Sequence, residues 1–125
     1  MARKQGKGTR LEVFSGKQAG LNRVICQIFE KKSPLIAYDV WRQIKAIKGH
    51  KRVDSKTAYR RMEALEQQGL ISQMGTRLGK RGGDKTLYEL TLRGKATLRL
   101  DEKSIEEFLR TATDEQLLKF IESFS

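Results

Sequence analysis

The feature of this sequence that most restricts its fold is a helical pattern that ends at Gly69 and is followed at once by a strand pattern. Residues 55–68 carry apolar side chains at the spacing of an α-helix. This stripe consists of Ala58, Met62 and Leu65. Asp54 or Ser55 has a side chain that can cap the start of the helix, and Gly69 is typical of a helix end. Strand-forming residues follow at once over 70–73, so the sequence predicts a helix that passes directly into a strand.

A second strand, predicted over 86–90, is separated from the first by a basic stretch rich in glycine. In this stretch Gly75, Gly79, Gly82 and Gly83 interleave with Arg77, Lys80 and Arg81. The composition predicts a β-hairpin with a long flexible tip. We refer to residues 74–85 as the wing.

Two helices are predicted before the helix at 55–68. Apolar residues at helical spacing indicate a first helix over 21–31, which ends because Pro34 disfavours helix at the preceding residue. The same spacing indicates a second helix over 38–47, after a short extended piece at 35–36. Ahead of the first helix, three apolar residues are expected to anchor a short extension on the core: Leu11, Val13 and Phe14.

Three further helices are predicted after the hairpin. Thr91 can cap a helix that runs through Leu98, and two others are expected over 102–111 and 114–124. Residues 113–116 match the capping-box pattern at the start of the last helix. The last two helices share an apolar face formed by Ile105, Phe108, Leu109, Leu117, Leu118, Ile121 and Phe124. Either a second copy of the chain covers this face, or the helices pack on the first helix of the same chain.

Positive charge is concentrated in three separate places. The chain has 26 Lys and Arg against 15 acidic residues, for a net charge of +11. Residues 1–20 hold five basic residues and one acid, residues 41–61 eight and one, and residues 72–86 four and one. Residues 101–125 reverse the sign, with seven acids and three bases. Clustered positive charge of this kind favours nucleic acid as a partner.

Several of these motifs resemble winged helix-turn-helix transcription regulators of the MarR and PadR type. The resemblance runs from Leu21 to near Leu98. Its motifs are Ser55, Tyr59 and Arg60, then Gly69-Leu70-Ile71, then Tyr88-Glu89-Leu90-Thr91 with Gly94-Lys95. It implies a recognition helix in the major groove of DNA, a wing on the flanking groove or backbone, and a homodimer formed by the outer helices.

The fold class predicted from the patterns and the resemblance is mainly α with a small β-hairpin wing, a winged helix-turn-helix plus C-terminal helices. Residues 1–19 are expected to be a basic, partly disordered arm, residues 20–99 the winged domain, and residues 100–125 the C-terminal helices, which could dimerise. No apolar run approaches the ~20 residues that cross a bilayer, and no signal peptide is recognisable. We therefore expect no membrane partner and a cytoplasmic, nucleoid-associated protein.

Ten residues are predicted to contact DNA: Lys51, Arg52, Ser55, Lys56, Thr57, Tyr59, Arg60, Arg77, Lys80 and Arg81. Arg60 can make a two-pronged contact to guanine from the first turns of the recognition helix. Lys51 and Arg52 suit phosphate, and the three wing residues suit a narrow minor groove or the backbone. The alternative is that these side chains only solvate a helix face and a loop tip.

The chain contains few residues of the types that carry out catalysis. The chain has one histidine, His50, and one cysteine, Cys26, so it offers neither a metal cluster nor a nucleophile paired with a base. Cys26 lies in an apolar segment and is predicted to be a core residue. We therefore predict that the protein is no enzyme and uses no cofactor and no metal.

Two other functions fit the same charge pattern. One is an RNA- or ribosome-associated winged helix, whose contacts would come from the wing and the basic arm because an A-form major groove excludes a helix. The other is an architectural chromatin protein without sequence preference. Double-stranded DNA is the predicted partner, and RNA is the alternative.

Overall fold

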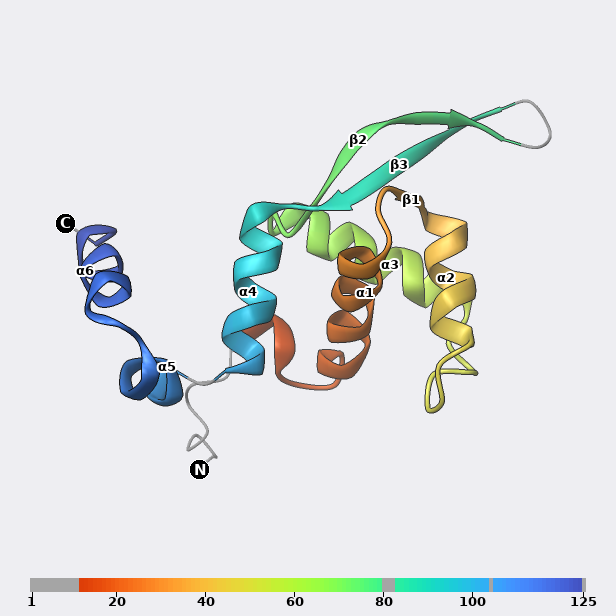
Figure 1. Cartoon of the computed structure of the whole chain (residues 1–125). Helices are drawn as coiled ribbons and strands as arrows, with labels where there is room; N and C mark the ends of the chain where they lie inside the picture. The colour runs from red at the N-terminus through yellow and green to blue at the C-terminus, as the bar shows by residue number, and fades with distance from the viewer. Residues whose placement is uncertain (1–11, 80–82, 104, 125) are drawn as a thin grey trace.

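The computed structural model describes residues 12–79, 83–103 and 105–124. The elements, in chain order, are the 3₁₀ turn η2 (Glu12–Phe14), α1 (Ala19–Lys31), β1 (Leu35–Ile36), α2 (Ala37–Lys45), α3 (Ser55–Gln67), β2 (Ile71–Leu78), β3 (Asp84–Leu90), α4 (Leu92–Glu102), α5 (Ile105–Thr111) and α6 (Asp114–Glu122). Figure 1 shows α1 to α4 grouped together and a β-hairpin that projects from them. The predicted fold class, mainly α with a β-hairpin wing, is confirmed.

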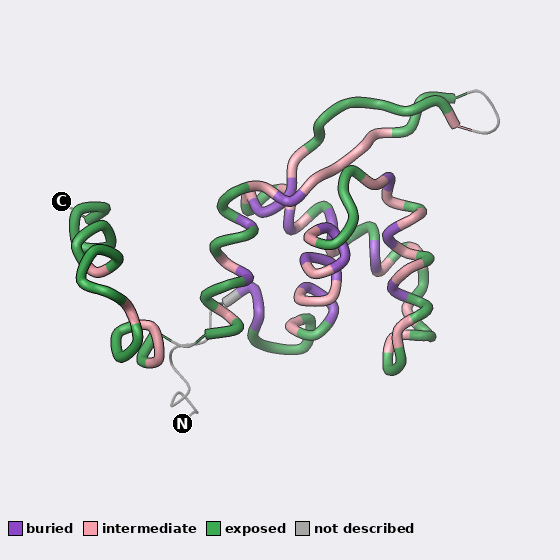
Figure 2. Tube along the Cα trace, viewed as in Figure 1, coloured by how far each residue is buried: buried purple, intermediate pink, exposed green. Residues whose placement is uncertain are grey.

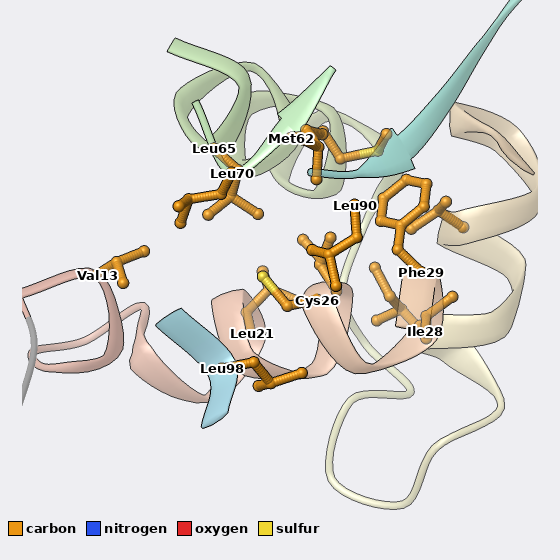
Figure 3. Close-up of a cluster of buried hydrophobic side chains, with 14 of the residues drawn as sticks. Val13, Leu21, Cys26, Ile28, Phe29, Met62, Leu65, Leu70, Leu90 and Leu98 are labelled. Atoms are coloured by element: carbon orange, nitrogen blue, oxygen red, sulfur yellow. The ribbon is translucent and has the colours of Figure 1, made fainter. Parts of the chain in front are cut away.

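The core is built around α1, whose inner face is fully covered. Ile25, Cys26 and Phe29 are at most 1% exposed. Side chains of α1 face Met62 and Leu65 of α3 in the close-up of Figure 3. Burying a large apolar side chain contributes about 1.5–3 kcal/mol, so this cluster is the main source of stability for the winged fold.

The extension ahead of α1 is anchored on this core. Val13 and Phe14 are buried, as predicted, and Asn22 of α1 donates a hydrogen bond to the Val13 carbonyl oxygen at 2.8 Å. The third predicted anchor, Leu11, lies outside the described residues, as does the basic arm before it.

The wing is longer than the sequence predicted. β2 and β3 pair antiparallel from Ile71 opposite Leu90 to Leu78 opposite Asp84, so the predicted strand end at 73 and the long tip that would follow it were wrong. Met74 forms a β-bulge, because Gln73 and Gly75 pair with consecutive residues of β3. The bulge accommodates one extra residue in β2, so the strand continues past Gly75. β1 adds a third strand beside β3.

Helix α3 begins and ends where the sequence predicted, to within one residue. The Asp54 carboxylate accepts a hydrogen bond from the Thr57 N–H at 2.8 Å. Gly69 follows the helix with φ of +81°, a conformation that favours glycine. Helix α2 ends at Lys45 instead of the predicted 47, because the next two N–H groups bond three residues back in a tighter turn.

Helix α4 is longer at its C-terminal end than predicted. Thr91 caps it by accepting the Gly94 N–H at 2.9 Å, as expected, but the helix continues past Leu98 to Glu102. Arg23 of α1 reaches across to Asp101 and pairs with its carboxylate at 2.6 Å. Because α4 includes residue 102, α5 begins at residue 105 and not at the predicted 102.

Gly94 marks the closest approach of α4 to the sheet. A Cβ at this position would lie 2.2 Å from the Leu70 carbonyl oxygen and 2.6 Å from Cδ1 of Leu90. Neither atom can retreat easily, since one is backbone and the other is packed in the core. The distance explains why a glycine follows the Leu90-Thr91 pair at this spacing.

Helices α5 and α6 lie apart from the winged core (Figure 1). The tube in Figure 2 is green or pink along both of them, and no residue of either helix is buried. The capping box at Thr113 and Gln116 is present, as predicted. No helix within the described part of the chain is long and apolar enough to cross a membrane.

Candidate nucleic-acid interface

The outer face of α3 carries the first group of predicted contact residues. Lys56 and Arg60 are exposed, and Tyr59 is 39% exposed. The opposite face is the buried stripe predicted from the sequence, Ala58, Met62 and Leu65. The helix therefore presents two cations and a phenol to solvent over its first two turns.

Asp54 organises the N-terminal end of this face. Its pKa is lowered, first by the hydrogen bond from the Thr57 N–H, then by the Thr57 hydroxyl, with smaller contributions from Arg60 and Lys56. The Thr57 N–H is thus engaged in the cap, and Ser55 is half-buried beside it. Lys56 and Arg60 remain the residues of this helix that are best placed to reach a ligand.

The turn between α2 and α3 presents Lys51 and Arg52 to solvent. The turn is tied to α2 because the Trp41 indole N–H donates to the Val53 carbonyl oxygen at 2.9 Å. The Lys45 ammonium lies 4.9 Å from the centre of the Trp41 ring, within the range of a cation–π interaction. These contacts hold the basic turn next to the start of α3.

Arg77 is the one predicted wing contact that the structure describes, since Lys80 and Arg81 lie outside the described residues. It is exposed on β2, directly opposite Lys85 of β3. Its guanidinium lies 3.5 Å from the carboxylate of Asp39, in the first turn of α2. The wing is therefore linked to α2 by a partly exposed ion pair.

A hollow of about 700 Å³, which we call the wing hollow, lies between α2, α3 and the wing. It brings together Tyr59 and Arg77, two predicted contact residues that come from different elements. Its other lining residues are Ile36, Ala37, Tyr38, Asp39, Arg42, Gly79, Gly83, Lys85, Thr86 and Tyr88. Tyr38, Arg42 and Lys85 are not among the residues predicted to contact DNA.

Part of the wing hollow could have been predicted from residue spacing in the sequence. Tyr38 and Arg42 are four residues apart, so they share one side of α2, away from the buried Val40 and Ile44. Lys85 could not have been found in this way, because its position opposite Arg77 depends on the bulge in the wing.

Comparison with known proteins identifies the family. The model of the transcriptional regulator PadR-like family matches residues 25–100, more than half of the 125 residues. The chain belongs to the PadR-like family of transcriptional regulators. Of the two regulator types that the motifs resemble, the match is to PadR.

Solved structures of this family share the fold. A PadR-like regulator from Bacillus cereus is 16% identical with a TM-score of 0.58, covering 81% of this chain and 92% of its own. A PadR family regulator from Clostridium difficile is 22% identical with a TM-score of 0.56, covering 83% and 96%. Bacillus subtilis PadR, solved in complex with operator DNA, is 23% identical with a TM-score of 0.57, covering 87% and 62%. None of the curated proteins matches the chain significantly.

The basic surface of this PadR-like chain has an acidic boundary. Glu66, in the second half of α3, accepts a hydrogen bond from the Gln73 side chain of β2 at 3.0 Å. The pKa of Tyr88 is raised by burial first, then by Glu66 and Glu63. Positive charge on α3 is thus confined to its N-terminal half.

The structure offers little for metal or thiol chemistry. No group of three or more potential metal ligands occurs among the residues that the structure describes. Burial raises the pKa of the Cys26 thiol to about 12, so this side chain stays protonated as a core residue. The prediction that Cys26 is part of the core is confirmed.

Proposed function

We propose that this PadR-like chain binds double-stranded DNA and regulates transcription, with α3 in the major groove and the wing on the flanking groove or backbone. The observation that carries the proposal is the exposed basic face of α3 next to the wing. An α-helix fits the major groove of B-DNA, and its first turns approach the base edges most closely. The similar fold of Bacillus subtilis PadR, which was solved with operator DNA, supports this interpretation.

The ten predicted contact residues take different roles in this proposal. Arg60 contacts guanine, and Lys56 a base or a phosphate, while Ser55, Thr57 and Tyr59 line the same groove. Lys51 and Arg52 bind phosphate and position the domain. Arg77, with Lys80 and Arg81 of the same wing, contacts the flanking minor groove or backbone.

We favour DNA over RNA because the exposed cations of α3 can reach base edges only in a groove that is wide enough for a helix. The major groove of A-form RNA is too narrow and deep for one. A regulator of this kind works where the chromosome lies, so we place the protein in the cytoplasm, associated with the nucleoid. The role is one of binding, and we propose no catalysis.

The experiment is selection from a random duplex pool at ~150 mM salt, where nonspecific phosphate binding is already weak. We expect a sequence motif to be enriched. Replacing Arg60 with Ala should weaken binding to that motif by about 1–3 kcal/mol. Arg93→Ala, which removes an exposed arginine of α4 away from the proposed DNA contacts and the proposed dimer interface, is the matched control. Absence of any motif, with RNA competing better than DNA, would refute the proposal.

We further propose that the regulator is a homodimer assembled through α5 and α6. Support comes from large apolar side chains that the rest of the described chain leaves exposed, among them Leu118 at 59% and Phe124 at 76%. A symmetric dimer presents two recognition helices to two half-sites. The selection tests this too, because a dimer should recover a palindrome.

A further inference from the structure

We propose that Arg23 of α1 is a positioning residue, which sets the distance between the two recognition helices of the dimer. It holds Asp101, in the last turn of α4, against α1, close to the point where the chain leaves the winged core for α5 and α6. The inference rests on the proposed DNA-binding homodimer and adds to it the residue that fixes its geometry. Arg23 itself is not one of the proposed DNA contacts.

The Arg23 guanidinium joins three elements of the fold. Its Nε donates to Oδ2 of Asp101 at 2.6 Å, and its Nη2 lies 3.4 Å from Oδ1 of the same carboxylate. Nη2 also lies 3.4 Å from the carbonyl oxygen of Phe14, and the guanidinium carbon lies 5.4 Å from the centre of the Phe14 ring, within the range of a cation–π interaction. Helix α1, the turn η2 and the end of α4 therefore meet at one planar group.

This contact is largely shielded from water. The side chain of Asp101 is 4% exposed and that of Arg23 is 27% exposed, while Phe14 is completely buried. The neighbouring residue Asn22 donates to the Val13 carbonyl oxygen, so η2 is fixed on α1 as well. A two-pronged contact between guanidinium and carboxylate restricts direction as well as distance. The pair can therefore hold the end of α4 at a defined angle to α1.

The last turn of α4 is tied to α1 a second time, on the surface. Arg99 pairs with Glu30, near the C-terminal end of α1, and with Glu102 of its own helix. The Arg99 side chain is 60% exposed, and exposed ion pairs constrain a structure weakly. The shielded pair between Arg23 and Asp101 is therefore the stronger of the two constraints.

The end of α4 determines the direction of the C-terminal helices. Only residues 103 and 104 separate α4 from α5, and no residue of α5 or α6 is buried. In Figure 1 both helices lie beyond α4, apart from the rest of the core. Their orientation relative to the core therefore depends on how the last turn of α4 is held.

The recognition helix is connected to this contact through the core. Helix α1 packs on Met62 and Leu65 of α3 (Figure 3), so α1 and α3 move together. In a symmetric dimer joined through α5 and α6, a tilt at the end of α4 occurs in both copies and displaces both recognition helices. Neighbouring base pairs are about 3.4 Å apart along a duplex. A small tilt is therefore enough to change which spacing of half-sites the dimer fits.

The test measures the distance between the two copies of α3 by pulsed electron spin resonance. Gln67→Cys places a spin label on the exposed last residue of α3, and the native Cys26 is inaccessible to the reagent. We expect one narrow distribution of distances in this labelled parent. Arg23→Lys keeps the charge but loses the two-pronged contact, and Asp101→Asn keeps the shape but loses the charge. Each should broaden or shift the distribution.

Two control variants distinguish positioning from a general loss of charge. Arg93→Lys changes an exposed arginine of α4, and Glu102→Gln changes the carboxylate next to Asp101, whose partner Arg99 lies in the same helix. Both should leave the distribution as narrow as in the labelled parent. Thermal melting verifies that each variant is folded, and sedimentation velocity verifies that it still dimerises.

A second measurement uses duplexes that carry the selected half-sites at spacings that differ by one base pair. The wild-type chain should bind one spacing several-fold more tightly than its neighbours. Arg23→Lys should lose this preference and bind a single half-site as wild type does. Loss of stability alone would weaken binding to every duplex to the same extent, so it cannot produce this pattern.

The outcomes separate this inference from the proposed function. If the labelled parent shows a broad distribution, or if Arg23→Lys and Asp101→Asn keep a narrow one, the positioning role is refuted and the proposed function stands. A labelled parent that is monomeric refutes the proposed dimer and this inference with it. If the wild-type chain does not bind duplex DNA, the proposed function is refuted, and a distance that changes in both variants would still identify Arg23 as the residue that fixes the dimer.

Discussion

The winged core and the C-terminal helices bury their apolar side chains to very different extents. The core cluster of the described chain runs from Val13 to Leu98 and includes residues that are completely inaccessible. In α5 and α6 no residue is buried. Their aromatic rings contact one another instead, at 5.5 Å between Phe108 and Phe120 and at 5.0 Å between Phe120 and Phe124.

One chain therefore contains two kinds of element. The core satisfies its own apolar surface and can hold the proposed DNA-contact residues in place. The C-terminal helices expose an apolar face within the described part of the chain, and their segment is acidic where the core is basic. Exposed apolar clusters of this kind mark interaction sites, so each test below asks whether the two regions respond differently.

The largest effect is expected at Gly94, in the core. Gly94→Ala forces a Cβ against the Leu70 carbonyl oxygen, so the free energy of unfolding should fall by about 3 kcal/mol or more. Urea denaturation measures this change. Lys95→Ala, at the exposed neighbouring position, should stay within about 0.5 kcal/mol of wild type. A well-tolerated alanine at Gly94 would mean that α4 packs less tightly than described.

The next largest effect is expected in the C-terminal helices and concerns association. Leu118→Ser removes an apolar contact from both copies of a dimer, so its dissociation constant should rise about 30-fold, or about 2 kcal/mol. Sedimentation velocity over a concentration series measures it. Leu92→Ser, an exposed leucine of α4, is the control and should leave association unchanged. A wild-type chain that stays monomeric throughout would contradict the proposed dimer.

A smaller effect is expected when a threonine that caps a helix is replaced in each of the two regions. Thr91 caps α4 in the core, and Thr113 caps α6 outside it. Thr91→Ala should lower the global free energy of unfolding by about 1 kcal/mol. Thr113→Ala should speed hydrogen exchange in α6 and leave exchange in the core unchanged, because α6 adds nothing to the core cluster. Equal effects of the two variants on the core would contradict the separation of the regions.

The smallest effect is a pH dependence that only the core should show. The pKa of Asp54 is lowered from its ordinary 3.8 by the hydrogen bond from Thr57, so its cap stabilises α3 fully above pH 3.8. That stabilisation disappears as the pH falls through the lowered pKa. Asp54→Asn keeps a cap that cannot titrate. Its melting temperature should therefore depend less on pH in this acidic range than that of wild type, with Thr113→Ser as a control that introduces no titrating group. An unchanged pH profile would show that Asp54 is not the group involved.

Local patterns in the sequence predicted much of the winged core. The buried stripe of α3, its cap at Asp54, its end at Gly69 and the caps at Thr91 and Thr113 were all confirmed. Each depends on residues within about one helical turn of each other, so the interactions that produce it can be recognised from neighbouring positions in the sequence. The motifs of the resemblance share this property, which is why they identified the fold.

Contacts between distant residues decided the rest. The wing extends past Gly75 because β3 supplies partners for it, and α4 extends to Glu102 where Arg23 of α1 holds Asp101. The wing hollow exists only because α2 and β3 meet, which places Arg42 near Lys85. Neighbouring residues along the chain are enough to predict the helices, their caps and the basic character of the protein. Which charges share a site and which apolar face stays exposed follow from the tertiary structure, since both depend on residues that are far apart in the chain and close together in space.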